Sequence, residues 1–303
     1  MTEPKSNLPA SIAARLLNRA KQTGDDYQVL LASFCFERFL HRLGMSEVRD
    51  RFILKGAMLL RLWSDRPYRA TRDLDLTRRG DGSHEAIRED VRRICATPVE
   101  DDGVVFVPDA IRIDAIRAED EYAGTRVTLP ARCGTARLML QIDIGLADAV
   151  WPAPQRCVYP ALLDFAPADV LAYPREAVVA EKFEAMVALG DRNSRIKDFF
   201  DIHFLASRFE FDRATLVEGV RRTFERRGTL IPAEPPIALT AAYWENPSRP
   251  AQVRAFARRA GLKVPENPGT EFAGLLSAFL LPVVDDLRKG EGRKGTWRPG
   301  GPW

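Results

Sequence analysis

Cysteine and histidine are scarce in this chain of 303 residues, which holds four cysteines and three histidines. The cysteines Cys35, Cys95, Cys133 and Cys157 are scattered, with no Cys-x-x-Cys pair and no histidine close enough to complete a zinc site. This usage excludes a cysteine-based zinc module. It is better explained by buried free thiols.

Long hydrophobic runs are also lacking. The longest run, Phe272 to Val284, is shorter than the roughly 20 residues that span a bilayer, and Pro282 interrupts it. The first eight residues have no apolar core of the kind that a secretory signal needs. With 46% hydrophobic and 29% charged residues, the composition is that of an ordinary globular protein. We therefore expect a cytoplasmic protein with no membrane partner.

Charge of one sign does not dominate, because the formal net charge is only +3, too small to indicate a nucleic-acid binder by itself. Local basic clusters do occur at Arg221-Arg222, at Arg226-Arg227 and in the tail from Arg288 to Arg298. These clusters could contact phosphates, for example those of an RNA. Solvated helix faces would give the same pattern, so both interpretations stay open.

The first half of the chain has a mixed pattern of helices and strands. Residues 11–43 and Ser83 to Ala96 have helical spacing, with Ser83 as a plausible N-cap. Phe52 to Leu54 reads as a strand that leads through Lys55-Gly56 into a helix start at Ala57 to Trp63. Further strands are predicted at 72–77, 103–107, 111–116, 125–129 and 136–144. We expect an α+β domain with a mixed or antiparallel sheet.

The second half is predicted to be an α-helical domain. Prolines are frequent from Pro152 to Pro174, which indicates a domain connection. Helical patterns follow at 175–189, 196–208, 212–226, 250–261 and 270–287. The last residues are rich in Gly, Lys and Arg and have little to bury. The predicted organisation is a first domain at 1–155, a helical domain at 156–287 and a disordered basic tail at 288–303.

Three carboxylates form the most informative pattern. Asp73 and Asp75 lie two apart on an alternating strand, so their side chains leave one face while Leu74 points into the core. Asp143, between two isoleucines, projects from one face of the last predicted strand. If the three carboxylates lie together, each close pair repels by about 4 kcal/mol at 4 Å with an effective dielectric near 20, so the cluster needs cations. Oxygen ligands without His or Cys suit Mg²⁺ or Mn²⁺.

The Asp-x-Asp pattern is common on exposed strands and gains weight from the preceding Lys55-Gly56. A strand that ends in Gly and runs into a helix presents free backbone N–H groups, which can bind phosphate. A nucleoside triphosphate and its metal ions could therefore share one site.

These segments carry a resemblance. Leu54 to Arg61 followed by Arg69 to Leu76 resembles the signature of the DNA polymerase β-like nucleotidyltransferase superfamily, and more narrowly that of the AbiEii/AbiGii toxin family. The segment Ala180 to Gly190, continued by Asn193 to Ile202, is the more specific part of the match. The family pattern has Gly-Gly followed by Thr or Ser after the lysine, whereas this chain has Gly56-Ala57-Met58, which removes a hydroxyl contact to phosphate.

The resemblance implies a nucleotidyltransferase fold and names site residues. It implies that Asp73, Asp75 and Asp143 bind metal and that Lys182 and Asp198 belong to the catalytic site. Nucleotide contacts are expected from Lys55, Gly56, Ala57, Arg69, Thr71 and Lys182, where Lys182 suits the triphosphate as a point charge. A solvated lysine on a helix is the plain alternative for Lys182.

Neighbouring residues have structural alternatives. Asp198 and Asp201 share a helix face, where they could hold Lys182 or form an ion-pair network with Arg195 and Lys197. Ser194 is expected as the N-cap of that helix, and His203 as a packing residue. Arg61 could orient phosphate or acceptor, or lie on the surface.

The leading hypothesis is a toxin of a toxin–antitoxin system that transfers nucleotides from a triphosphate to the 3′ end of tRNA. The tRNA acceptor and an antitoxin partner come from the resemblance alone, and the possible RNA contacts are Arg221, Arg222, Arg226 and Arg227. Two alternatives are the same chemistry on a protein or small molecule, and a non-catalytic nucleotide- or RNA-binding module. The three intact carboxylates count against the last of these.

Overall fold

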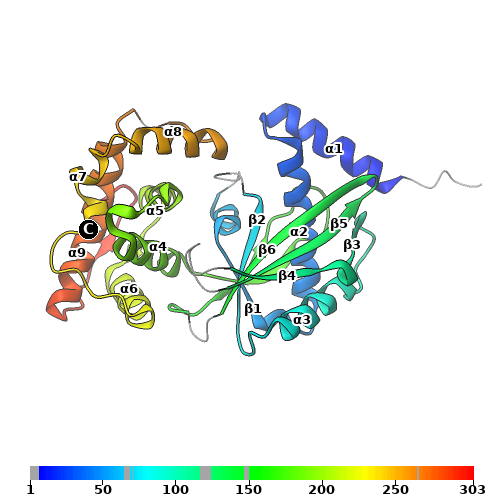
Figure 1. Ribbon diagram of the computed structural model, residues 1–303, viewed down its shortest axis with the longest axis horizontal. Coiled ribbons are helices and arrows are strands. Elements are labelled where there is room, and N and C mark those ends of the chain that lie inside the picture. Colours follow the sequence, from blue (N-terminus) through cyan, green and yellow to red (C-terminus); the bar gives the residue numbers. More distant parts are fainter. Residues whose placement is uncertain (1–6, 65–68, 70, 117–123, 147–149, 265) are drawn as a thin grey trace, which may run out of the picture. The chain divides into compact units, whose positions relative to one another are not determined.

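The computed structural model describes residues 7–64, 69, 71–116, 124–146, 150–264 and 266–303 (Figure 1). The chain forms two compact units. The first comprises Met1–Ala149 with Pro154–Tyr173, and the second comprises Val150–Ala153 with Pro174–Trp303.

The described residues of the first unit form one mixed sheet of eight strands. Its strand order is β3-β5-β6-β2-β1-β8-β7, with β4 paired to β5. The pairs β2 with β6 and β1 with β8 are parallel, and the other pairs are antiparallel. The strands are β1 (Phe52–Lys55), β2 (Asp73–Arg78), β3 (Val104–Phe106), β4 (Arg112–Ile116), β5 (Gly124–Cys133), β6 (Ala136–Leu146), β7 (Gln155–Tyr159) and β8 (Ala168–Ala172). The predicted α+β class with a mixed sheet is confirmed.

The core of this unit lies between one face of the sheet and its helices α1 (Leu8–Thr23), α2 (Tyr27–Met45) and α3 (His84–Ala96) (Figure 1). Alternate residues of the central strands point into this core, so Leu74, Ile142 and Val127 are fully buried. The other face of the same strands is thereby left to polar side chains. Ser83 caps α3 as predicted, because its hydroxyl accepts the N–H of Ala86.

The segment after Gly56 is a 3₁₀ helix, η2 (Ala57–Trp63), where the sequence predicted a helix start. Its residues 57–60 are buried, which anchors the end of β1 in the core. Further 3₁₀ turns are η1 (Arg49–Arg51) and η3 (Pro108–Ala110).

The second unit is mainly helical, as the pattern of the second half predicted. Its helices are α4 (Arg175–Leu189), α5 (Ile196–Arg208), α6 (Arg213–Arg227), α7 (Ala241–Trp244), α8 (Arg249–Ala260) and α9 (Gly274–Lys289), with 3₁₀ turns at η5 (Gly190–Arg192) and η6 (Ile237–Leu239) and a π-helical turn at η7 (Gly269–Ala273). An aromatic cluster joins them, in which Phe199 contacts the rings of Tyr243, Trp244 and Phe272.

The main division between the two units lies between residues 173 and 174. The sequence analysis had placed this domain boundary between residues 155 and 156. The difference arises because β7 and β8, inside the proline-rich stretch, pair with each other and extend the sheet of the first unit through β1. A proline-rich composition marks turns, but it does not say whether the residues between them pair with a distant strand.

The tail also differs from its prediction as a disordered segment. Residues Thr296–Trp297 form β10, which pairs with β9 (Phe211–Asp212). Trp297 is fully buried and donates its indole N–H to the carbonyl of Ala206 at 2.7 Å, while Trp303 stacks on Phe279. Two tryptophans thus supply the buried area that the Gly- and Arg-rich composition hides.

Within the described part of the chain, no helix is both long and apolar enough to span a membrane.

Candidate active site

Three carboxylates lie together on the polar face of the first unit's sheet. Asp73 and Asp75 come from β2 and Asp143 from β6, and the parallel register places Asp75 opposite Asp143. One oxygen from each of the three lies within 4.8 Å of the others, and all three residues are half-buried. The structure thus brings together the acidic set that the sequence proposed.

The donor set fits a hard divalent cation. Mg²⁺ binds oxygen at about 2.1 Å, so ligand oxygens of one ion are separated by roughly 3 to 4 Å, which the cluster's span can accommodate after small side-chain rotations. Carboxylate oxygens are all that these three residues offer, which suits Mg²⁺ or Mn²⁺ better than a soft metal.

Two cations on the neighbouring strands flank Asp75 and Asp143, so that four charged side chains form one row across β1, β2, β6 and β5. Lys55 of β1 stands opposite Asp75, and Arg126 of β5 stands opposite Asp143. Arg126 makes a forked ion pair with Asp143, with Nε–Oδ1 at 2.9 Å and Nη2–Oδ2 at 2.8 Å. Gln141 also donates to Asp143 Oδ2, at 3.3 Å. The sequence analysis assigned no role to Arg126 or Gln141. Only the strand register reveals that Arg126 lies beside Asp143. The two-residue spacing of Gln141 and Asp143 on one strand is a local signal that could have indicated their contact.

Gly56 is required by the site's geometry. Its φ of 72° and ψ of −156° are accessible essentially to glycine alone. A Cβ at this position would lie 1.9 Å from Oδ2 of Asp75. The backbone after β1 therefore passes directly against a carboxylate of the acidic cluster. The next residue, Ala57, is 7% exposed and has no polar side-chain group to offer a ligand.

Of the other predicted nucleotide contacts, Thr71 donates its hydroxyl to the carboxylate of Asp73. This bond orients one member of the acidic cluster. Arg69 is half-buried in the connection that leads to β2. Lys55 extends its ammonium group across the sheet, such that a Cβ on Gly145 of β6 would lie 3.0 Å from the Lys55 Nζ.

Arg61 is not a surface residue, which removes one of the two interpretations of its role. Its side chain is 11% exposed and its Nε lies 4.0 Å from Oε1 of Glu37 on α2. Among the described residues, its Nε and Nη1 are buried without a hydrogen-bond partner. Glu37 is itself buried and accepts the N–H of Leu162 at 2.8 Å. Burial raises the pKa of Glu37 to about 7, although that hydrogen bond and nearby arginines oppose the shift.

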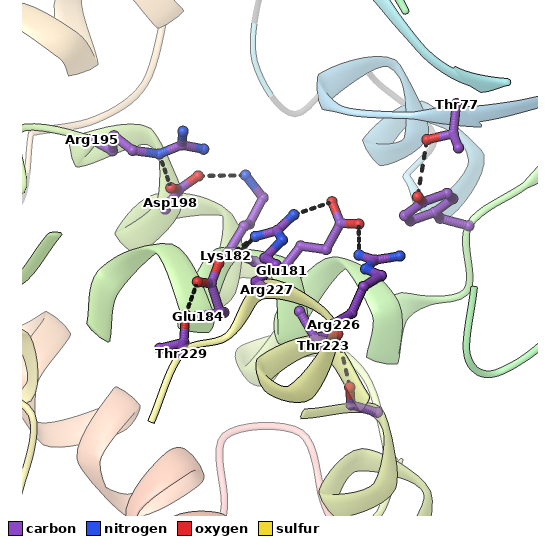
Figure 2. A network of polar contacts seen from close by, with 12 residues as sticks. Thr77, Glu181, Lys182, Glu184, Arg195, Asp198, Thr223, Arg226, Arg227 and Thr229 are labelled. Carbon is purple, nitrogen blue, oxygen red and sulfur yellow. Dashed lines mark hydrogen bonds and ion pairs between the residues drawn. The ribbon is translucent and has the colours of Figure 1, made fainter. Parts of the chain in front are cut away.

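In the second unit, Lys182 of α4 is bound by two carboxylates of α5. Its Nζ lies 2.6 Å from Asp198 Oδ1 (Figure 2). The same Nζ lies 2.9 Å from Asp201 Oδ2, and both aspartates are fully buried. Arg195 adds a second cation to Asp198, with Nε–Oδ2 at 2.6 Å. Burial alone would raise the pKa of Asp198, but Lys182 and Arg195 outweigh it and hold that pKa below its ordinary value.

The loop before α5 is held by residues that the sequence analysis missed. Ser194 was expected as the N-cap, but the N-cap position is Arg195, and no side chain in the described part of the chain caps it. Instead, the side chain of buried Asn193 accepts the N–H of Arg195 at 2.8 Å. Tyr243 and Arg249 both donate to the carbonyl of Asn193 at 2.7 Å. No local sequence signal links Arg249 to this loop, because the contact joins residues far apart in the chain.

His203 packs as expected. Its ring meets Phe272 edge-on with centroids 5.5 Å apart, and burial lowers the pKa of the imidazole. A base role has no support from this geometry.

The four arginines proposed for RNA contact lie on α6 and are all engaged by glutamates. Arg221 pairs with Glu218 and Glu225, and Arg222 pairs with Glu218 and lies over the ring of Trp151. Arg226 and Arg227 reach Glu181 on α4, and Arg227 also pairs with buried Glu184 (Figure 2). The pairing favours the alternative that these arginines stabilise helix faces, most clearly for Arg227, whose side chain is 15% exposed.

Comparisons with known proteins give a family match and similar solved structures. The family described as nucleotidyl transferase AbiEii toxin, Type IV toxin–antitoxin system, matches residues 38–278. A search of curated proteins gives no match. Among solved structures, a candidate nucleotidyltransferase from H. pylori is 14% identical, with a TM-score of 0.47 over 89% of this chain and 100% of that chain. JHP933 from Helicobacter pylori is 13% identical, with a TM-score of 0.45 over 88% of this chain and 95% of that chain. The family match covers most of the chain, which therefore belongs to the AbiEii nucleotidyltransferase toxin family of type IV toxin–antitoxin systems.

Proposed function

We propose that this nucleotidyltransferase moves a nucleoside monophosphate from a nucleoside triphosphate to an RNA acceptor, the 3′ end of tRNA, in a metal-dependent reaction in the cytoplasm. Such a reaction would block translation, as a toxin requires. The observation that carries the proposal is the cluster of Asp73, Asp75 and Asp143, which gathers three carboxylates within 4.8 Å beside the Gly56 turn.

Asp73, Asp75 and Asp143 would hold Mg²⁺ or Mn²⁺. When bound, such an ion supplies charge neutralisation at the phosphates and activation of the attacking oxygen. The chain's own part is to fix the carboxylates in place. Thr71 orients Asp73 by a hydrogen bond, and Gln141 orients Asp143 in the same way.

The triphosphate is assigned to the cations and backbone around this cluster. We assign it Lys55, the backbone of Gly56 and Ala57, and the side chains of Arg69 and Thr71. Lys182 is assigned to the triphosphate as well, with Asp198 as the catalytic-site residue that holds it. In support, Lys182 is 13% exposed and already oriented by two buried carboxylates, so it is not a freely solvated surface lysine.

The acceptor is the least constrained part of the proposal. The family implies an antitoxin partner and a nucleotide substrate. A protein or small-molecule acceptor would use the same carboxylates. A purely binding module is disfavoured, since three crowded carboxylates cost electrostatic free energy without a cation.

A labelling experiment tests the proposal. The purified protein is incubated with each of the four labelled nucleoside triphosphates, Mg²⁺, and either total RNA or lysate protein. We expect label in the tRNA fraction, no label with EDTA, and none with Asp75→Asn. Sequencing of tRNA 3′ ends after induced expression identifies the added nucleotide. Label in protein alone would transfer the proposal to a protein acceptor, and label that persists in Asp75→Asn would end it.

A further inference from the structure

Arg126 binds the very oxygens that a metal ion needs at Asp143. The antiparallel register of β5 and β6 places the two residues side by side, and both nitrogens of the arginine fork are within 2.9 Å of the carboxylate. Both oxygens of Asp143 are therefore already engaged. Such forked, charge-assisted pairs are among the stronger polar contacts in proteins.

Asp143 cannot bind a divalent ion and the guanidinium of Arg126 at the same time with the full affinity that it has for each alone. An ion that shares the cluster with Asp73 and Asp75 must take an oxygen of Asp143, and it also brings positive charge next to the arginine. The attraction that holds Arg126 would then be offset by repulsion between two cations. Metal binding and the Arg126–Asp143 pair thus compete.

The sheet gives the displaced arginine another partner. Asp114 of β4 stands opposite Arg126 on the side away from Asp143, and it is exposed. The Arg126 side chain is 42% exposed, whereas that of Asp143 is 16% exposed. The guanidinium can therefore move while the carboxylate stays. Gln141, which also donates to Asp143, keeps the carboxylate oriented after the arginine has left.

We propose that Arg126 is an internal counter-cation of the acidic cluster, which a divalent metal ion must displace from Asp143 before the site is loaded. This inference rests on the proposed function, because it takes the three carboxylates to be the metal site. It makes Arg126 a regulatory residue for metal loading and leaves its guanidinium available for an anion, such as a triphosphate, once the metal is bound.

The test measures Mn²⁺ binding to the full-length protein without nucleotide. The proteins compared are the unaltered chain, Arg126→Ala and Arg126→Gln, each checked for folding by its unfolding midpoint. Loss of the competing cation should tighten Mn²⁺ binding about five-fold, the size expected for one partly exposed ion pair. Two variants are used so that a folding defect in one does not decide the result.

The matched control is Arg132→Ala. Arg132 lies on the same strand, six residues from Arg126 and so on the same face, and it is exposed. Six residues of strand separate the two positions by roughly 20 Å, so the control makes the same change of net charge away from Asp143. We expect its Mn²⁺ affinity to match that of the unaltered chain within about two-fold, because salt screens over such a distance.

Asp143→Asn separates the two proposals. If the carboxylates bind metal, Asp143→Asn weakens Mn²⁺ binding, and adding Arg126→Ala to it changes nothing further. Unchanged binding in Asp143→Asn would overturn the metal site and with it the metal-dependent function. Weakened binding in Asp143→Asn together with equal or weaker binding in both Arg126 variants would overturn only the competition, and would leave Arg126 as a residue that orients Asp143.

Discussion

Gly56 and Asp75 approach each other so closely that no side chain fits between them, since a Cβ on Gly56 would lie 1.9 Å from the carboxylate oxygen of Asp75. The contact joins the end of β1 to the middle of the acidic cluster. It explains why a glycine follows Lys55 for reasons beyond its φ of 72°.

The first prediction follows from this contact. Gly56→Ala should destabilise the protein by more than about 2 kcal/mol, because it combines backbone strain with a clash at Asp75. It should also weaken Mn²⁺ binding by displacing Asp75. The control is Gly80→Ala, where φ is +79° but no atom of the described residues lies within 4 Å of the new Cβ. The free energy of unfolding of each variant is measured in urea. An equal loss in both variants would contradict this account.

The second prediction concerns the acidic cluster without metal. Asp73→Asn should abolish nucleotide transfer yet leave stability in EDTA unchanged or raised, since it removes one of three crowded charges and keeps an acceptor for Thr71. Asp143→Asn should abolish transfer and lower stability by about 1 kcal/mol, because it also breaks the forked pair with Arg126. Denaturant midpoints in EDTA distinguish the two. Residual transfer by Asp73→Asn would count against the metal proposal.

The third prediction concerns Lys182. Lys182→Ala should weaken nucleotide binding and also destabilise the second unit by about 3 kcal/mol, because it leaves Asp198 and Asp201 buried with one cation fewer. Adding Asp201→Asn should recover part of the stability and none of the nucleotide affinity. Unfolding curves and titration with a non-hydrolysable triphosphate measure the two effects separately. Nucleotide affinity that returned together with stability would assign Lys182 a structural role alone.

The fourth prediction is a pH dependence of stability from Glu37. Its pKa is raised to about 7 in the folded protein, from an ordinary 4.5, chiefly by burial. The folded state therefore holds more protons than the unfolded state between these values. The stability contribution of Glu37 is complete below pH 4.5 and is lost as the pH rises to about 7, by up to roughly 3 kcal/mol.

Glu37→Gln should remove this dependence, because glutamine does not titrate and its side-chain oxygen can still accept the N–H of Leu162. The measurement is the difference in free energy of unfolding between the two proteins from pH 4.5 to 8. If the free energy of unfolding of the two proteins changes with pH in the same way over that range, Glu37 is ionised or exposed in the folded state.

The fifth prediction tests RNA contact on α6. Reversing the charges of Arg221 and Arg222, which are 42% and 49% exposed, should raise the KM for RNA and flatten its dependence on salt if they contact phosphates. The control reverses Arg258 and Arg259, an adjacent exposed pair at the end of α8. Equal effects of the two reversals would reduce the role of Arg221 and Arg222 to general charge. If RNA labelling is insensitive to salt between about 50 and 200 mM, the RNA backbone does not hold the acceptor.

Local sequence was sufficient for those parts of the fold and site that depend on periodicity. The alternation of Asp73, Leu74 and Asp75 requires two carboxylates on one face, because successive side chains of a strand point to opposite sides. Asp143 between Ile142 and Ile144 follows the same rule. The positions of the main helices and the cap at Ser83 are equally local, since they depend on residues within one or two turns.

Tertiary structure decided which of those elements pair or pack with one another. Periodicity does not say that β6 lies parallel to β2, yet that register puts Asp143 opposite Asp75. The antiparallel register of β5 with β6 likewise puts Arg126 opposite Asp143. It does not reveal that β8 pairs with β1, or that Trp297 of the basic tail is buried against the carbonyl of Ala206. These contacts join residues far apart in the chain, and their free energy comes from burial and pairing that exist only once the whole unit has folded.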